Sequence, residues 1–157
     1  MIDFPRLTII SGGQTGVDRA ALDAAIAAGL PQGGACPAGR LAEDGVIDAR
    51  YRLTETISAN PASRTRMNVR ESDATLIISP AEPDGGTRLT VRHAAKLGRP
   101  CLVVDPADHS AAEAILAWLR AADIRVLNIA GPRESKSPGV YGQALRLLTV
   151  VFSRLDF

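Results

Sequence analysis

The sequence predicts an α/β fold, an open parallel β-sheet with helices on both faces. Short apolar runs rich in β-branched residues alternate along the chain with longer runs whose apolar residues have helical spacing. Glycine-rich turns follow several of the short runs, as is typical of connections from a strand to a helix. Open parallel sheets bind ligands outside the carboxyl ends of their strands, so these turns are where we expect a site.

The composition is that of one globular domain, which we expect to span residues 1–157. Hydrophobic residues make up 46% of the chain and charged residues 22%. The formal net charge of +1 gives no overall field that would favour nucleic acid or an anionic membrane as a partner. With two cysteines, no apolar leader before Leu7 and no apolar run near the roughly 20 residues of a membrane span, a cytoplasmic protein is predicted.

The first strand is predicted at residues 7–10, and a helix follows it after the turn Ser11–Gly16. Thr15 and Asp18 have the spacing of a capping box, so the Thr15 hydroxyl is expected to cap this helix. Gly29 and Pro31 end the helix.

Residues 32–59 have the least regular pattern in the chain. A very short strand is expected within residues 33–37, and the rest is expected to be a long loop with residues 51–53 as its packing point. Asn60 followed by Pro61 then predicts a capped helix start, with the helix running to about Glu71.

The second half repeats the alternation of strand and helix more clearly. Ser110 is expected to cap the helix that follows it. The predicted elements are strands at 74–79, 100–104 and 124–130, and a helix at 85–98. Two more helices are predicted, one that starts at Ser110 and carries Ala114, Ile115, Trp118 and Leu119, and a last one that carries Ala144, Leu147, Leu148 and Val151.

Three glycine-bearing turns, Ser11–Gly16, Pro83–Thr87 and Gly131–Gly139, follow predicted strands and should lie along one edge of the sheet. Such turns can direct several backbone N–H groups at a ligand, and the helix behind adds the positive end of its dipole. Phosphate or another oxyanion is therefore the expected ligand. Neither double-glycine turn has the Lys-Ser/Thr of a Walker A loop or fits G-x-G-x-x-G, so ATP hydrolysis and dinucleotide binding are not predicted.

The candidate binding residues lie in these turns and on the helix after Asn60, where cationic, amide and hydroxyl groups can donate to an anion. They are Gly12, Gly13, Gln14, Thr15, Gly16, Arg64, Asn68, Gly85, Gly86, Thr87, Arg133, Ser135, Lys136 and Ser137. The alternative is that the glycines only form sharp turns and that residues 133–137 are a solvated basic turn. No metal site is predicted, because His93 and His109 have no His or Cys at ligand spacing.

Five stretches resemble the molybdenum cofactor carrier protein family, and together they cover nearly the whole chain. The wider pattern is similar to the Rossmann-like superfamily that includes the cytokinin-activating phosphoribohydrolases and the DNA-processing protein DprA. The stretches are SGGQTGVDRAALDAA, GGACPAGRLAEDGVI, RTRMNVRESDATLIIS, GGTRLTVRHA and GPRESKSPGVYGQAL.

The resemblance implies a Rossmann-like homo-oligomer that binds molybdenum cofactor (molybdopterin), a phosphorylated pterin, and hands it to molybdoenzymes. The phosphoribohydrolases carry a Pro-Gly-Gly-x-Gly-Thr-x-x-Glu motif, and Thr90 stands here where the catalytic glutamate would be. A hydroxyl cannot replace that carboxylate as a general base. Two alternatives remain: a nucleotide-processing hydrolase that cleaves an N-glycosidic bond or a phosphoester through Asp18, Asp44 or Glu82, and a regulatory module that senses a nucleotide.

Overall fold

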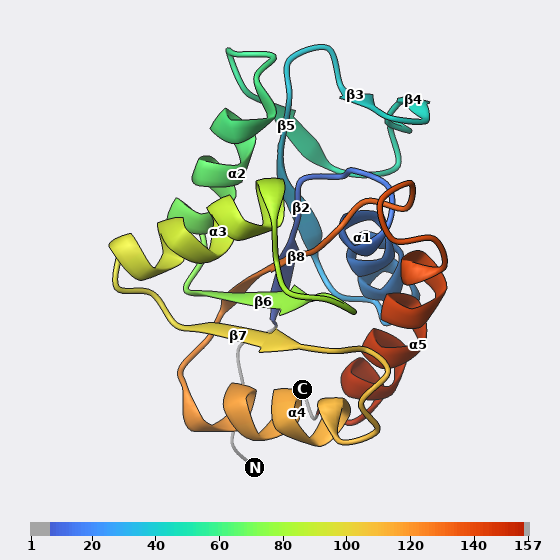
Figure 1. Ribbon diagram of the computed structural model, residues 1–157, viewed down its shortest axis with the longest axis vertical. Helices are drawn as coiled ribbons and strands as arrows, with labels where there is room; N and C mark the ends of the chain where they lie inside the picture. The colour runs from blue at the N-terminus through green and yellow to red at the C-terminus, as the bar shows by residue number, and fades with distance from the viewer. Residues whose placement is uncertain (1–6, 156–157) are drawn as a thin grey trace.

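The computed structural model describes residues 7–155, which form an α/β fold (Figure 1). The elements are β1 (Thr8–Ile10), α1 (Val17–Ala27), β2 (Gln32–Cys36), β3 (Leu41–Ala42), β4 (Gly45–Val46), β5 (Leu53–Glu55), α2 (Pro61–Arg70), β6 (Ala74–Ile78), α3 (Gly85–Lys96), β7 (Cys101–Val104), α4 (Ala111–Ala121), β8 (Val126–Ala130) and α5 (Val140–Ser153). The predicted alternation of strand and helix is confirmed.

Six strands form one sheet in the order β5-β2-β1-β8-β6-β7, and every recorded pair in it is parallel. The last strand of the chain, β8, lies between β1 and β6, where Ile9 pairs with Leu127 and Thr75 with Asn128. Because β1, β8 and β6 are neighbours, the turns that follow them emerge side by side at one edge of the sheet.

Helices cover both faces of the sheet, as predicted. In Figure 1 α2 and α3 lie to the left of the sheet, α1 and α5 to the right, and α4 at the bottom. α1 packs on α5 and α5 on α4, whereas α2 packs on α3. The sheet therefore separates two helical layers, an α1/α4/α5 layer and an α2/α3 layer.

The main hydrophobic core lies under the α1/α4/α5 layer. Because side chains alternate along a strand, Leu76, Ile78, Leu127 and Ile129 all point into this core, where they meet apolar helix residues such as Leu148. The opposite side of the same strands carries Thr75, Ile77 and Asn128, all buried. Polar residues thus lie under the α2/α3 layer, within the sheet itself.

Residues 32–59 contain more regular structure than the sequence predicted. The short strand is present as β2, but β5 pairs with it in parallel, and β3 and β4 form an antiparallel hairpin. β3, β4 and β5 have only two or three residues each, too few for a periodic pattern to show. The predicted packing point is confirmed, because Tyr51 is buried in a second apolar cluster with Leu22, Cys36 and Ile47.

Two predicted helix caps are wrong and one is confirmed. α1 starts after Gly16 with no side-chain cap, and the Thr15 hydroxyl instead donates to Glu43 and accepts from the backbone N–H of Glu134. Ser110 also does not cap α4, because its hydroxyl donates to Asp108 at 2.8 Å. Asn60 caps α2 as predicted, its side chain accepting from the N–H of Ala62 at 3.0 Å.

Candidate functional site

A cavity of about 460 Å³ lies at the carboxyl ends of β1, β6 and β8, between the three glycine turns and the α2/α3 layer. We call it the edge cavity. Of the predicted site residues, those that line it are Gly12, Gln14, Arg64, Asn68, Gly85, Gly86, Thr87, Arg133 and Lys136. Those outside its lining are Gly13, Thr15, Gly16, Ser135 and Ser137.

The first turn, Ser11–Gly16, is folded around the protein's own carboxylate. Asp18, only 7% exposed, lines the edge cavity, close to the backbone N–H groups of Gly12 and Gln14. Burial raises the pKa of Asp18 to about 6, although Arg64 and these two N–H groups lower it. The N–H of Val17, at the start of α1, donates to the carbonyl of Pro132 at 3.3 Å. Much of the hydrogen-bonding capacity of this turn is therefore taken by the protein.

Arg64 extends from α2 across the first turn. Its Nη1 donates to the carbonyl of Gly12 at 2.7 Å and lies 3.8 Å from a carboxylate oxygen of Asp18. A Cβ at position 12 would overlap the guanidinium, so this crossing requires glycine. A guanidinium has five N–H donors, which leaves Arg64 able to bind an anion in the cavity while it holds the turn.

The second turn leads directly into α3, which begins at Gly85 with a φ of +50°. The first recorded backbone bond of this helix start runs from the N–H of Arg88 to the carbonyl of Asp84 at 3.1 Å. The first N–H groups of any helix have no acceptor within the helix. In α3 these belong to Gly85, Gly86 and Thr87, and within residues 7–155 no other acceptor is recorded for them. Over the described residues, all three N–H groups before Arg88 are thus free, whereas at the start of α1 the first of them, that of Val17, is bonded to the carbonyl of Pro132.

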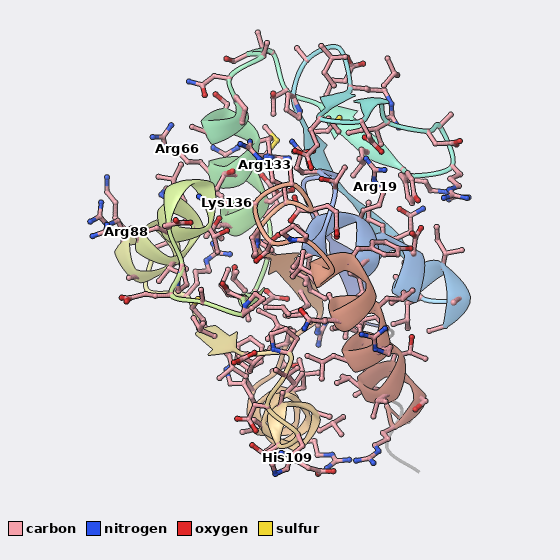
Figure 2. The ribbon with its side chains drawn as sticks, turned by 45° about the vertical axis from the view of Figure 1, so that its right-hand side comes forward. Arg19, Arg66, Arg88, His109, Arg133 and Lys136 are labelled. Atoms are coloured by element: carbon pink, nitrogen blue, oxygen red, sulfur yellow. The ribbon has the colours of Figure 1, made fainter. Side chains whose placement is uncertain are left out.

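Lys136 lies beside this helix start. Its ammonium pairs with Asp84 at 2.7 Å, and both side chains remain substantially exposed. Figure 2 shows Lys136 and Arg133 on the connection between β8 and α5, on the side that faces α2 and α3. The edge cavity therefore combines helix N–H donors with three cationic side chains, one from α2 and two from the third turn.

Glu43 holds the third turn in place. The Glu43 carboxylate accepts hydrogen bonds from the hydroxyl of Ser135 at 2.6 Å and from the backbone N–H of Ser135 at 3.1 Å. One of its oxygens also lies 3.5 Å from Nε of Arg133. The hydroxyls of Ser135 and Thr15 and the charge of Arg133 hold the pKa of Glu43 below its usual value. Because Glu43 lies between β3 and β4, its bonds to Ser135 and Thr15 anchor the third turn to the β3–β4 hairpin. The sequence did not predict this contact, because the three residues are far apart in the chain.

Polar side chains under the α2/α3 layer form the floor of the cavity. The amide of Asn68 is paired with the backbone N–H and carbonyl of Ala35, at 2.7 and 3.0 Å, so it ties α2 to β2. Thr90 donates to the carbonyl of Gly86 at 3.0 Å, and Asn128 to the hydroxyl of Thr75 at 3.3 Å. Asn128 was not among the predicted site residues, although a polar residue within the apolar run VLNIA indicates a special role.

Residues 7–155 contain neither a metal-binding cluster nor a membrane-spanning helix. There, no three His, Cys, Asp or Glu side chains are grouped so as to hold a metal ion. No helix in this part of the chain is long and apolar enough to cross a membrane.

Comparison with known proteins gives two similarities over most of the chain. Residues 9–152 match the model of the circularly permutated YpsA SLOG family. The fold superimposes with a TM-score of 0.90 on the crystal structure of "Putative molybdenum carrier protein" from Syntrophus aciditrophicus SB, at 46% sequence identity over 94% of this chain and 96% of that one. No curated protein matches at a significant level.

Proposed function

Because the chain belongs to the circularly permutated YpsA SLOG family, we propose that its edge cavity binds a phosphorylated small molecule with the phosphate at the start of α3. The observation that carries this proposal is the free helix start at Gly85–Thr87, with Lys136 beside it. Backbone N–H groups and the positive end of a helix dipole favour a phosphate, and an adjacent ammonium adds a charge-assisted hydrogen bond.

The proposed ligand is the phosphorylated pterin of molybdenum cofactor, or a nucleotide-like molecule with the same phosphate. The 46% identical protein named for molybdenum carriage supports the pterin. A volume of about 460 Å³ lies within the usual range for small-molecule sites. The donors around the cavity fit the phosphate of such a ligand. We further propose that the protein is a cytoplasmic homo-oligomer that passes this cargo to molybdoenzymes.

Equilibrium dialysis with molybdopterin, molybdenum cofactor, AMP and GMP tests the proposal. Lys136→Ala removes the ammonium beside the α3 start, so we expect its dissociation constant for the preferred ligand to rise about tenfold, the effect of losing one charge-assisted hydrogen bond. Lys96→Ala, at the far end of the same helix, is the matched control and should bind as the wild type does. Wild-type binding weaker than millimolar for all four ligands would refute the proposal.

Hydrolysis of a nucleotide is a second candidate, because Asp18 is a cavity-lining carboxyl with a pKa of about 6. A carboxyl that titrates near neutral pH suits proton transfer. Against this, the Thr90 hydroxyl, at the position of the phosphoribohydrolase glutamate, is bonded to the Gly86 carbonyl. Incubation with nucleoside monophosphates followed by chromatography distinguishes the two candidate functions. A binding protein leaves the nucleotides intact. An enzyme releases free base or phosphate, and Asp18→Asn should abolish that release.

A further inference from the structure

The two helices of the α2/α3 layer carry only positive charges. Their sequences, PASRTRMNVR and GGTRLTVRHAAK, contain six arginine and lysine residues and no aspartate or glutamate. The net charge of the whole chain is only +1, so this segregation does not show in the composition. Arg64 points into the edge cavity, and the other five cations are exposed.

These five residues form what we call the basic surface: Arg66, Arg70, Arg88, Arg92 and Lys96. On each helix they recur at intervals of four residues, so each row follows one side of its helix. Figure 2 shows Arg66 and Arg88 projecting from neighbouring helices into solvent on the same side of the molecule.

The charges of the basic surface are close together and largely without acidic partners. α2 and α3 pack against each other. Burial lowers the pKa of His93 of α3, and the nearby charges of Arg66, Lys96 and Arg70 lower it further. Over residues 7–155, the only ion pair recorded for the five cations joins Arg70 to Glu71 at 3.5 Å, with both side chains more than half exposed. A partner with many negative charges would therefore meet an uncompensated positive surface.

The chemistry of the basic surface excludes several kinds of partner. Neither helix contains Phe, Tyr or Trp, and in both helices as the structure describes them no large apolar side chain is exposed. A stable protein interface needs apolar or aromatic anchors at its centre, and an interfacial membrane helix needs an apolar face. A second copy bound about a two-fold axis through this surface would bring like charges together.

A nucleic-acid double helix is the kind of partner that fits this surface, because rows of cations can bind its phosphate backbone without apolar contacts. Single strands are bound largely by stacking bases on aromatic rings, which this surface does not have. Arginine, four of the five cations, makes bidentate bonds to phosphate. We propose that the basic surface of α2 and α3 binds the phosphate backbone of double-stranded nucleic acid without sequence preference.

Fluorescence anisotropy with a labelled 20-base-pair DNA duplex, from 50 to 200 mM salt, tests this proposal. Each neutralised phosphate contributes about −0.9 to the slope of log K against log salt concentration, so five cations predict a slope of about −4.5. Arg88→Gln/Arg92→Gln should reduce that slope by about 2 and weaken binding at least tenfold at 50 mM salt. A duplex of unrelated sequence should bind equally well.

The control is Arg52→Gln/Arg120→Gln, which removes the same charge from exposed sites outside α2 and α3 and should leave binding unchanged. Thermal unfolding checks that both double variants are folded. Lys136→Ala should bind the duplex as the wild type does, which separates this proposal from phosphate binding in the edge cavity. Three results would overturn it: no duplex binding at 50 mM salt, equal loss in the control, or preference for single-stranded DNA or polyglutamate over the duplex.

Discussion

The two faces of the sheet differ in what they bury. Under α1, α4 and α5 the strands carry Leu76, Ile78, Leu127 and Ile129 against apolar helix residues. Under α2 and α3 the same strands carry the polar Thr75 and Asn128 beside Ile77, and the edge cavity lies on this side. Because apolar burial drives folding and polar groups bind ligands, the first face should determine stability and the second should determine binding.

The largest effect is expected for truncation in the apolar face. Leu148→Ala removes a fully buried side chain of α5, which should lower the free energy of unfolding by about 2–5 kcal/mol. Thr90→Ala, in the α2/α3 layer, loses one hydrogen bond to a backbone carbonyl and should cost only about 1 kcal/mol. Urea unfolding measures both, and equal costs would contradict the proposed difference between the faces.

The buried carboxyl of Asp18 should lower the stability of the folded protein as the pH rises to neutral and above. Its pKa of about 6 in the folded protein exceeds the ordinary 3.8, so the folded state holds this proton more tightly than the unfolded state does. The stability that Asp18 contributes is therefore present below about pH 4 and is lost as the pH rises through 6, by roughly 3 kcal/mol in all.

The difference in unfolding free energy between the wild type and Asp18→Asn isolates this effect. We expect the wild type to lose roughly 2.5 kcal/mol relative to the variant between pH 4 and pH 7. Asp123→Asn, at an exposed site, is the control and should show a nearly constant difference from the wild type. A constant difference for Asp18→Asn as well would mean that burial does not raise this pKa.

A smaller effect is expected at Gly16, where the first and third turns meet. Gly16 has a φ of +80°, and a Cβ there would clash with the backbone of Pro132 and Glu134. Gly29 has a similar φ of +70° with open space around it. Gly29→Ala should cost about 1 kcal/mol from backbone strain alone, whereas Gly16→Ala should cost more, up to about 3 kcal/mol. If thermal unfolding shows the same cost for both, the two turns are not in close contact.

The sequence predicted the central strands and the position of the three glycine turns, because β1, β6 and β8 are apolar runs bounded by turn residues. It did not predict β5, which forms only because β2 offers it a partner strand. The first and second glycine turns look alike in sequence. They differ in the structure because Arg64 of α2 donates to the Gly12 carbonyl and the N–H of Val17 to the Pro132 carbonyl, tertiary contacts that no local pattern reveals.

The central claim is that phosphate binds at the start of α3 rather than at the first glycine turn. Titration of ¹⁵N-labelled protein with AMP, followed by NMR, tests it directly, because the amide signals of Gly85, Gly86 and Thr87 report on one turn and those of Gly12 and Gln14 on the other. We predict that the three α3 signals shift in proportion to occupancy, while Gly12 and Gln14 shift less because the Asp18 carboxyl and Arg64 already lie against the first turn. Shifts confined to the first turn, or no shifts at millimolar AMP, would contradict the claim.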